Sequence, residues 1–418
     1  MRILCGVELN ILLINHYAGS PHHGMEYRPY YFAREWVRLG HKVQIVASAR
    51  SHVRARQPHL THLSRLDETI DGIGYAWFKA PDYSGNGVKR VWNMFSFISR
   101  LYREGSMLVQ FCKPDVVIAS STYPMDIWPA HRIAKMAGAK LVFEVHDLWP
   151  LSPIELGGIS KWHPFIIMVQ AAEDYAYRHA DVVISMLPNV RDYMESRGMA
   201  PHKLHIVPNG VDPAEWQADG TDLQGTAKEM ISTIRGQGLH IIGYAGTHGV
   251  ANALDTFLDA AKMMQDENVA FVLVGSGPGK YDLQQRAAAE QLQNVWFIDP
   301  VNKIQIPSLL QWFDIAYIGW HRQSLYRFGI APNKLMDYMM AGRPVLHAVD
   351  AGNDPVRDSG CGLSVKPEDP LAIVYGIRSL MELSELERKV MGQRGRAYVM
   401  KNHTYPVLAK KFLEACNN

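Results

Sequence analysis

The sequence predicts an α/β protein of two tandem domains, each built on a doubly wound parallel sheet. Short runs rich in Val and Ile alternate with longer stretches of mixed, helical character along the 418 residues. These runs are continuously apolar, which is typical of strands buried on both faces of a parallel sheet. Strand–helix alternation on this scale indicates a doubly wound fold, and the length suits two domains of about 100–200 residues.

The expected strands follow the apolar runs in chain order. They cover 10–17, 41–48, 114–120, 140–146, 181–186 and 204–209, then 239–246, 269–275, 295–300, 314–320 and 344–349. Helices are expected between them, for example at 304–313. The stretch from Gly210 to Gly238 lacks a strand signal, so we place the junction there, with domains at 1–210 and 211–399. Two such domains form a cleft between the carboxyl ends of their sheets, where these folds bind ligands.

Composition excludes several classes of protein. The 43 basic and 41 acidic residues leave a net charge of +2, which excludes a nucleic-acid-binding protein that works through bulk charge. No apolar run reaches the about 18–20 residues that span a bilayer, and the N-terminus is read as a first strand, not a secretion signal. Cys5, Cys112, Cys361 and Cys416 are far apart and lack zinc-site spacing, so we expect idle thiols in a reducing cytoplasm.

A glycine-containing loop, GSPHHGMEYRP at 19–29, follows the first expected strand and leads into a helix. Gly19 and Gly24 allow a tight turn and close approach to a ligand, and Arg28 stands at the helix start, where anions are favoured. The loop is neither a GxGxxG nor a Walker loop. An ordinary strand-to-helix connection is therefore an equal alternative.

His146 and Asp147 stand where the expected strand 140–146 ends, at the edge that faces the predicted cleft. A histidine there could contact a sugar hydroxyl or exchange a proton, and the carboxylate could orient an acceptor. A purely structural His–Asp pair is the alternative.

The most informative stretch is RFGIAPNKLMDYMMAGRPV at 327–345. Gly329 and Pro332 frame a turn before a helix, whose free N-terminal amides and Lys334 suit a phosphate. Asp337 lies about one turn further on, where it could accept hydrogen bonds from ribose hydroxyls. Together these features indicate a nucleotide site. An amphipathic helix with a solvated Lys–Asp pair is the alternative.

Motifs over nearly the whole chain carry a family resemblance. They are NHYAGSPHHGMEYRPYYFA, FEVHDLWPLSP, ADVVISMLPNVRDYMESRG with KLHIVPNGVD, GYAGTHGVANALDTFLDAA, FVLVGSGPGK, and PNKLMDYMMAGRPVL with GCGLSVKPED. With them the sequence resembles the two-domain GT-B glycosyltransferases of family 4. More narrowly, it is similar to WbuB-like L-fucosamine transferases of bacterial polysaccharide assembly.

The resemblance implies a nucleotide-sugar donor held mainly by the C-terminal domain and transfer with retention of configuration. It implies no essential metal and no cofactor. Asp337 matches the second carboxylate of the family's E-x7-E motif, which holds the ribose. The other positions that match donor contacts are Gly246, Thr247, Phe297, Asp299, Gly329, Ile330, Asn333 and Lys334. His146 matches the histidine that touches the donor sugar, Gly19 the N-domain loop near it, and about 400–418 the helix that returns to the first domain.

The chain also departs from the family pattern. The first Glu of E-x7-E is missing, because Gly329 stands eight residues before Asp337. The Arg and Lys that often follow GYAG are missing too, and no basic residue occurs before Lys262. Charge for the diphosphate would then come from Lys334, Arg28 or backbone amides. The chain has no Asp-x-Asp triplet, which agrees with metal independence.

The segment GNGVKRVWNMFSFISRLYR at 85–103 is a candidate membrane-surface helix. Its apolar residues at helical spacing are Trp92, Phe95, Ile98 and Leu101, and its flanking cations are Lys89, Arg90, Arg100 and Arg103. A basic amphipathic helix of this kind can lie in a bilayer interface. A buried helix with a charged rim is the alternative.

We therefore expect a cytoplasmic, retaining glycosyltransferase that is peripheral on the inner membrane face and does not bind nucleic acid. It would move an N-acetylfucosamine-like or other amino sugar from a UDP-sugar to a polyprenyl-diphosphate-linked or glycan acceptor, in O-antigen or capsule assembly. The departing phosphate would take the acceptor proton, while His146 and Asp147 position and polarise. The alternatives are a sugar-nucleotide 2-epimerase of the same architecture and a catalytically weak nucleotide-sugar-binding assembly protein.

Overall fold

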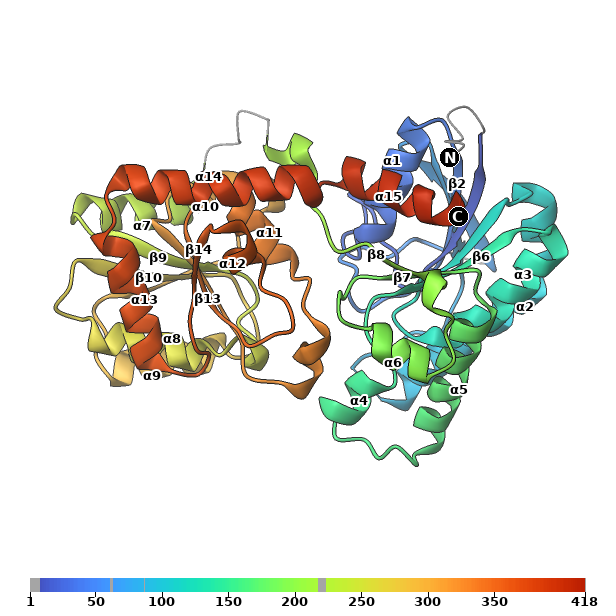
Figure 1. The fold of residues 1–418 in the computed structure, drawn as a ribbon, viewed down its shortest axis with the longest axis horizontal. Helices are drawn as coiled ribbons and strands as arrows, with labels where there is room; N and C mark the ends of the chain where they lie inside the picture. Colours follow the sequence, from blue (N-terminus) through green and yellow to red (C-terminus); the bar gives the residue numbers. More distant parts are fainter. Residues whose placement is uncertain (1–7, 61–62, 86, 217–222, 418) are drawn as a thin grey trace. The chain divides into compact units, whose positions relative to one another are not determined.

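The computed structural model describes residues 8–60, 63–85, 87–216 and 223–417. The chain divides into two compact units (Figure 1). The first unit runs to Asn209 and is completed by residues from Tyr405 onward, and the second unit is Gly210–Thr404. Each unit is a sheet covered by helices on both faces, as the continuous apolar runs predict.

The sheet of the first unit has the order β3-β4-β2-β1-β5-β6-β7-β8. Its strands are β1 (Asn10–Ile14), β2 (Lys42–Ser48), β3 (Arg65–Ile70), β4 (Ile73–Phe78), β5 (Val116–Ala119), β6 (Lys140–Val145), β7 (Val182–Ser185) and β8 (Leu204–Ile206). Every pairing is parallel except that between β3 and β4, which form a hairpin at the sheet edge. The sequence reasoning missed this hairpin, because β3 is a half-exposed edge strand without a Val/Ile run.

Helices and the returning C-terminal segment cover the first sheet. They are α1 (Arg28–Arg38), α2 (Val88–Cys112), α3 (Ile127–Ala137), α4 (Leu151–Glu155), α5 (Pro164–His179), α6 (Arg191–Ser196) and α15 (Tyr405–Asn417). The ring of Tyr405 stacks on Tyr31 at 4.6 Å between centroids. Trp36 is fully buried and donates from its indole nitrogen to the carbonyl of Ala409 at 3.2 Å. Helix α15 therefore completes the core of the first unit.

The second unit is an all-parallel sheet with the order β11-β10-β9-β12-β13-β14. Its strands are β9 (His240–Ala245), β10 (Val269–Val274), β11 (Val295–Ile298), β12 (Ile315–Gly319), β13 (Val345–Ala348) and β14 (Gly362–Ser364). Its helices are α7 (Gly225–Gly236), α8 (Leu254–Met263), α9 (Lys280–Ala289), α10 (Ile306–Leu310), α11 (Asn333–Met340), α12 (Pro355–Ser359), α13 (Pro370–Glu382) and α14 (Glu385–Asn402). The helix expected at 304–313 is shorter than predicted, since α10 follows a separate 3-10 turn at Lys303–Gln305.

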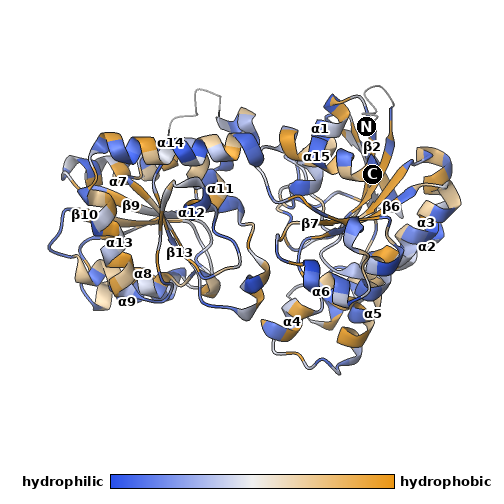
Figure 2. Cartoon of the chain, in the orientation of Figure 1, coloured by the Kyte–Doolittle hydropathy of each residue, from blue (hydrophilic) through white to orange (hydrophobic). Residues whose placement is uncertain are grey.

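Burial explains why the strands read as unbroken apolar runs. Neighbouring residues of β9 enter different cores: Ile241 packs in one cluster of the second unit and Ile242 in the other. Figure 2 shows the strands of both sheets in hydrophobic colours, with hydrophilic residues concentrated on helices and loops. The carboxyl ends of the strands are therefore the places where polar residues can gather.

Helix α2 corrects part of the predicted membrane face. Ile98 and Leu101 are buried in the first unit, so the expected four-residue stripe is split. Trp92 and Phe95 remain 66% and 37% exposed, and Arg100 donates from Nε to the carbonyl of Lys79 at 2.9 Å. Within the described ranges, no helix combines the length and apolar character needed to cross a bilayer.

The cysteines that the structure describes are free thiols, as predicted. Cys112 is half-buried, and Cys361 and Cys416 are buried. Burial raises the pKa of Cys361 to about 11 and that of Cys416 to about 12, which keeps both thiols protonated. Cys5 lies outside the described residues.

Candidate active site

The carboxyl ends of β9 and β10 form a loop cluster in which glycine is required by close backbone packing. A Cβ on Gly275 would lie 2.0 Å from the carbonyl oxygen of Gly246, and one on Gly277 would lie 2.6 Å from that of His248. A Cβ on Gly246 would approach the Nζ of Lys334 to 3.1 Å. These glycines let two loops and a lysine share one small volume.

Lys334 supplies a cation in the first turn of α11. Its Nζ donates to the hydroxyl of Tyr244 at 2.8 Å and to Oδ1 of Asn252 at 2.7 Å. Burial lowers its pKa to about 8. The helix N-terminus adds free amides and a partial positive charge, so this corner favours an anion.

Asp337 follows one turn later on α11. Burial raises the pKa of its carboxyl to about 7. The positive charge of Lys303 lowers this pKa, and the negative charge of Glu215 raises it. Lys303 and Glu215 are themselves paired at 2.7 Å. Asp337 thus remains a candidate acceptor for ribose hydroxyls, close in sequence and structure to Lys334.

The turn before α11 corrects one expectation. Gly329 adopts a positive φ of 97°, which only glycine takes without strain. Its amide donates to the carbonyl of Tyr326 at 2.9 Å, and the amide of Ile330 donates to Oδ1 of Asn353 at 2.7 Å. Both amides therefore have partners inside the protein, whereas the resemblance implies that Gly329 and Ile330 contact the donor. Asn353 was not predicted, because it holds this turn from 23 residues further along the chain.

The remaining predicted donor residues differ in how they are placed. Asn333 and Thr247 are exposed, and the carbonyl of Thr247 accepts from the hydroxyl of Tyr244 at 2.7 Å. Phe297 lies on β11, half-buried. Asp299 is 86% exposed but paired with Lys280 at 2.7 Å. Lys280, which the sequence analysis did not single out, also donates to the carbonyl of Gly275 at 3.0 Å and so fixes the loop after β10.

His248 is a second residue that sequence reasoning missed. Its side chain is fully buried, and in the described part of the chain neither ring nitrogen has a hydrogen-bond partner. Burial, with Lys280 nearby, lowers its pKa to about 4, so the imidazole is neutral at physiological pH. The loop after β9 therefore supplies no side-chain cation, and Lys334 provides the positive charge beside it.

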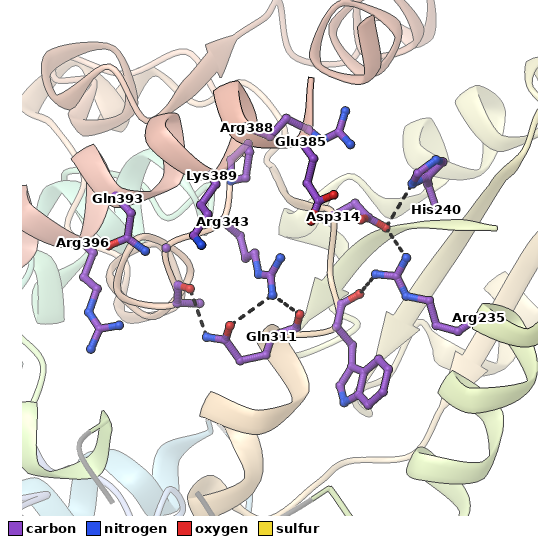
Figure 3. A pocket seen from close by; sticks show the side chains of 14 residues that line it. Arg235, His240, Gln311, Asp314, Arg343, Glu385, Arg388, Lys389, Gln393 and Arg396 are labelled. Atoms are coloured by element: carbon purple, nitrogen blue, oxygen red, sulfur yellow. Dashed lines mark hydrogen bonds and ion pairs between the residues drawn. The ribbon is translucent and has the colours of Figure 1, made fainter. Parts of the chain in front are cut away.

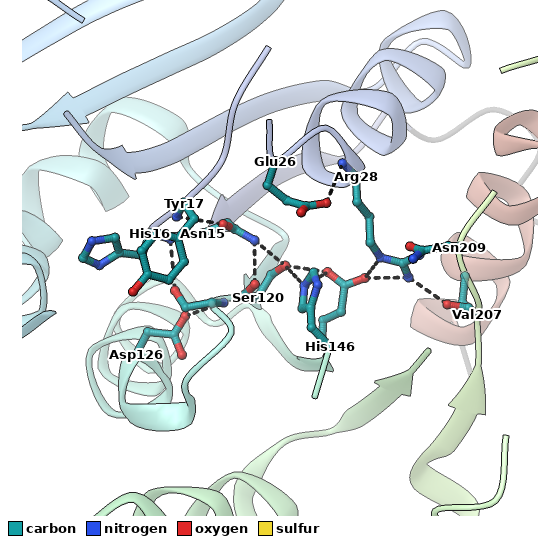
Figure 4. Close-up of polar contacts among 12 residues, drawn as sticks. Asn15, His16, Tyr17, Glu26, Arg28, Ser120, Asp126, His146, Val207 and Asn209 are labelled. Carbon is teal, nitrogen blue, oxygen red and sulfur yellow. Dashed lines mark hydrogen bonds and ion pairs between the residues drawn. The ribbon is translucent and has the colours of Figure 1, made fainter. Parts of the chain in front are cut away.

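In the first unit, the corresponding edge carries a buried ion pair (Figure 4). Glu144, near the end of β6, bonds the guanidinium of Arg28 at 3.0 Å to Nε and 2.9 Å to Nη2. Arg28 also donates to the carbonyls of Val207 and Pro208, each at 2.7 Å. Its guanidinium is buried and engaged throughout, which corrects the expectation that Arg28 provides charge for a diphosphate.

His146 is oriented by the same carboxylate. Its Nε2 lies 3.0 Å from the Oγ of Ser120 and 3.5 Å from an oxygen of Glu144. Burial lowers the pKa of His146, but the hydrogen bond and charge of Glu144 outweigh burial, so the net shift is upward. Burial likewise raises the pKa of Glu144, yet Arg28 and His146 bring it to about 2. A permanent carboxylate therefore holds an imidazole that can carry a proton, and Asp147 beside it is exposed.

Close backbone packing requires glycine at two positions of the 19–29 loop. A Cβ on Gly19 would lie 1.9 Å from the carbonyl oxygen of Gly24, so the loop folds back on itself. Gly24 has a φ of 98° and would meet the amide of Ala55 at 3.0 Å. Packing within the loop accounts for both glycines, so close approach to a ligand is not needed to explain them.

A polar cluster at the ends of β1 and β5 was also missed. Asn15 donates to the carbonyl of Ser120 at 2.6 Å, and the Nδ1 of His16 lies 2.5 Å from the hydroxyl of Tyr123. Burial raises the pKa of Asp126 to about 7. Asn15, His16 and Ser120 fall within the expected strands 10–17 and 114–120, whereas the observed strands end at Ile14 and Ala119.

Two family models match these two units. Residues 22–215 match Glycosyltransferase Family 4, and residues 240–383 match Glycosyl transferases group 1. The chain is a glycosyltransferase with the GT-B fold. Its two parallel-sheet units are the two domains of that fold.

Relatives and solved structures agree with this glycosyltransferase assignment. A Pseudomonas aeruginosa protein named "Probable glycosyltransferase WbjE" is 20% identical over 348 residues, or 80% of this chain and 82% of that protein. The D-rhamnosyltransferase WbpZ of P. aeruginosa PAO1 is 23% identical over 356 residues, or 79% of this chain and 88% of that protein. The structure of Anabaena HepE with UDP and glucose has a TM-score of 0.65 at 16% identity, covering 98% of this chain and 100% of that one.

The lowered pKa of Lys334 predicts a pH dependence of diphosphate binding by the glycosyltransferase. The ammonium is charged below about pH 8 and loses its proton above it, so the affinity for UDP should fall about tenfold between pH 7 and pH 9. Isothermal titration calorimetry across this range measures the effect. In Lys334→Arg the charge persists and the fall should disappear; an equal fall in both proteins would contradict the role of Lys334. His248, with a pKa of about 4, does not titrate in this window.

Proposed function

We propose that this glycosyltransferase transfers an amino sugar, N-acetylfucosamine-like, from a UDP-sugar to a lipid-linked or glycan acceptor in bacterial cell-surface polysaccharide assembly. The observation that carries the proposal is the anion-favouring corner formed by Lys334, Gly246 and the start of α11. Asp337, one turn away, supplies the acceptor for ribose. The relatives WbjE and WbpZ are named as glycosyltransferases, and HepE is described with UDP and glucose, which supports glycosyl transfer from a UDP-linked donor.

The proposed reaction proceeds with retention and without a metal. The charge that develops on the leaving diphosphate is balanced by Lys334 and by the helix dipole of α11. The leaving phosphate accepts the proton of the attacking hydroxyl on the same face of the sugar. His146, held by Glu144 and Ser120, donates a hydrogen bond to the transferred sugar, and Asp147 orients the acceptor.

The nucleotide part of the proposal is tested by thermal stabilisation with UDP, GDP, ADP and TDP, each without metal. A ligand at about 100 times its dissociation constant stabilises the folded state by roughly 2.7 kcal/mol. We expect UDP to raise the melting temperature most, and Asp337→Ala to lose the shift because the ribose contact is removed. Asp358→Ala, an exposed carboxylate of the same unit, is the matched control. A UDP shift that survives in Asp337→Ala would place the ribose elsewhere.

The role of His146 is tested by turnover. His146→Ala should lower kcat by about 10- to 100-fold, the value of one charge-assisted hydrogen bond of about 1.5–3 kcal/mol, while UDP affinity stays the same. His179→Ala, an exposed histidine of the first unit, serves as the control. Unchanged turnover in His146→Ala would remove it from the mechanism. Formation of an epimerised sugar nucleotide without any acceptor would instead identify a 2-epimerase.

We further propose that the enzyme works at the inner face of the cytoplasmic membrane through the exposed aromatic residues of α2. Trp92 and Phe95 are exposed near the basic start of that helix, beside Lys89. Trp92→Ser combined with Phe95→Ser should abolish flotation with anionic vesicles. Tyr281→Ser, a 68% exposed aromatic of the second unit, should float like the wild type. Undiminished flotation of the double variant would overturn this surface.

A further inference from the structure

The second unit contains a cavity at the amino ends of its strands, the edge opposite the donor residues (Figure 3). His240 opens β9 and Asp314 immediately precedes β12, and both line the cavity. The loops with Gly246 and Gly275 follow the other ends of β9 and β10. The cavity volume is about 680 Å³, which is within the range of small-molecule sites. It is therefore a separate site from the one proposed for the donor.

The acidic group at the floor of this cavity is already neutralised. One carboxylate oxygen of Asp314 lies 2.9 Å from Nη1 of Arg235 and accepts from the amide of Ile241 at 2.7 Å. The same oxygen lies 3.6 Å from Nδ1 of His240. Asp314 thus anchors the start of β9, and its charge is paired with that of Arg235.

The walls of the cavity carry an excess of positive charge. Besides the paired Arg235 and Asp314, one carboxylate lines the cavity, that of Glu385. Four cations line the cavity as well: Arg343, Arg388, Lys389 and Arg396. Arg343 is held by the side-chain oxygen of Gln311 at 3.1 Å, and Arg388 by the carbonyl of Leu383 at 2.5 Å. Burial lowers the pKa of Arg343 and Arg235 acts in the same direction, whereas the carboxylates of Asp314 and Glu385 act against this shift. Bonds to neutral oxygens fix these guanidinium groups without neutralising them.

Helix α14 presents the remaining cations in a row. Glu385, Lys389, Gln393 and Arg396 are separated by four, four and three residues, so they share one face of the helix. Lys389 and Arg396 stand roughly 10 Å apart along the axis, at about 1.5 Å per residue. A single monovalent ion cannot contact both cations. A ligand with two or more negative charges, held between the long side chains of Lys389 and Arg396, can contact both.

We propose that this cavity binds a phosphate-bearing ligand with at least two negative charges. Phosphate oxygens match the fixed guanidinium groups of Arg343 and Arg388 and the ammonium of Lys389. Trp312 also lines the cavity, and its carbonyl accepts from Nη2 of Arg235 at 2.6 Å. The chemistry is shared by free phosphorylated metabolites and by anionic lipid headgroups, and the experiment distinguishes these sources.

The test uses the full-length protein and inorganic pyrophosphate at physiological salt, with hydrogen exchange measured by mass spectrometry. We expect protection of peptides from α14, observed separately from those of the donor loops around Gly246. Lys389→Gln combined with Arg396→Gln should weaken binding at α14 by about tenfold or more. Arg394→Gln combined with Lys401→Gln removes two exposed charges from the same helix and should leave it unchanged.

A second arm uses vesicles of phosphatidic acid or of phosphatidylcholine. Protection of α14 peptides by phosphatidic acid vesicles, not by phosphatidylcholine vesicles, that is lost only in the 389/396 double variant assigns the ligand to a lipid headgroup; this readout is separate from flotation through α2. If pyrophosphate protects α14 but phosphatidic acid vesicles do not, the ligand is assigned to the free phosphorylated metabolites. The proposal is overturned if neither probe distinguishes the two double variants. Unchanged melting temperatures confirm that both variants are folded, and protection of the donor loops reports on the donor site independently.

Discussion

The buried pair of Arg28 and Glu144 is the interaction on which the architecture of the first unit depends. Two charges removed from water are costly, and they persist in a folded protein only when both are fully bonded. Arg28 satisfies this condition by bonding Glu144 and the carbonyls of Val207 and Pro208. It therefore joins the first turn of α1, the end of β6 and the last residues before the second unit. Loss of either partner would leave a charge without its counterion in the core.

The same pair sets the chemistry of the neighbouring histidine. Because Arg28 and His146 keep the pKa of Glu144 near 2, that carboxylate stays ionised at any physiological pH. An ionised carboxylate 3.5 Å away favours the protonated imidazole of His146 and restrains its ring. In the second unit, charge is arranged differently. There a single lysine, partly desolvated between Tyr244 and Asn252, stands beside loops in which the missing side chains of Gly246 and Gly275 leave room.

Much of the fold could be predicted from the sequence because a strand that is buried on both sheet faces has a continuously apolar sequence. The runs at β9 and β10 are almost continuously apolar, apart from His240 at the start of β9, and strands form there. The hairpin of β3 and β4 could not be predicted in this way, because β3 is partly exposed to solvent and has no continuous apolar run. Lys334 and Asp337 could be predicted because one helix turn brings them together. The partners of Arg28 and Ile330 could not, because they come from 116 or more and 23 residues away, where local spacing carries no information.

The packing of α15 on α1 also constrains the order in which the protein can be completed during synthesis. Trp36 and Tyr31 lie near the start of the chain, but Ala409 and Tyr405, which cover them, follow the whole second unit. At about 5–20 residues per second, the ribosome takes roughly 10–40 s to make the segment Gly210–Thr404. Throughout that interval an aromatic face of the first unit is exposed without its cover. The second unit is contiguous in sequence and can finish folding first. The core of the first unit, although it is synthesised earlier, is therefore completed last.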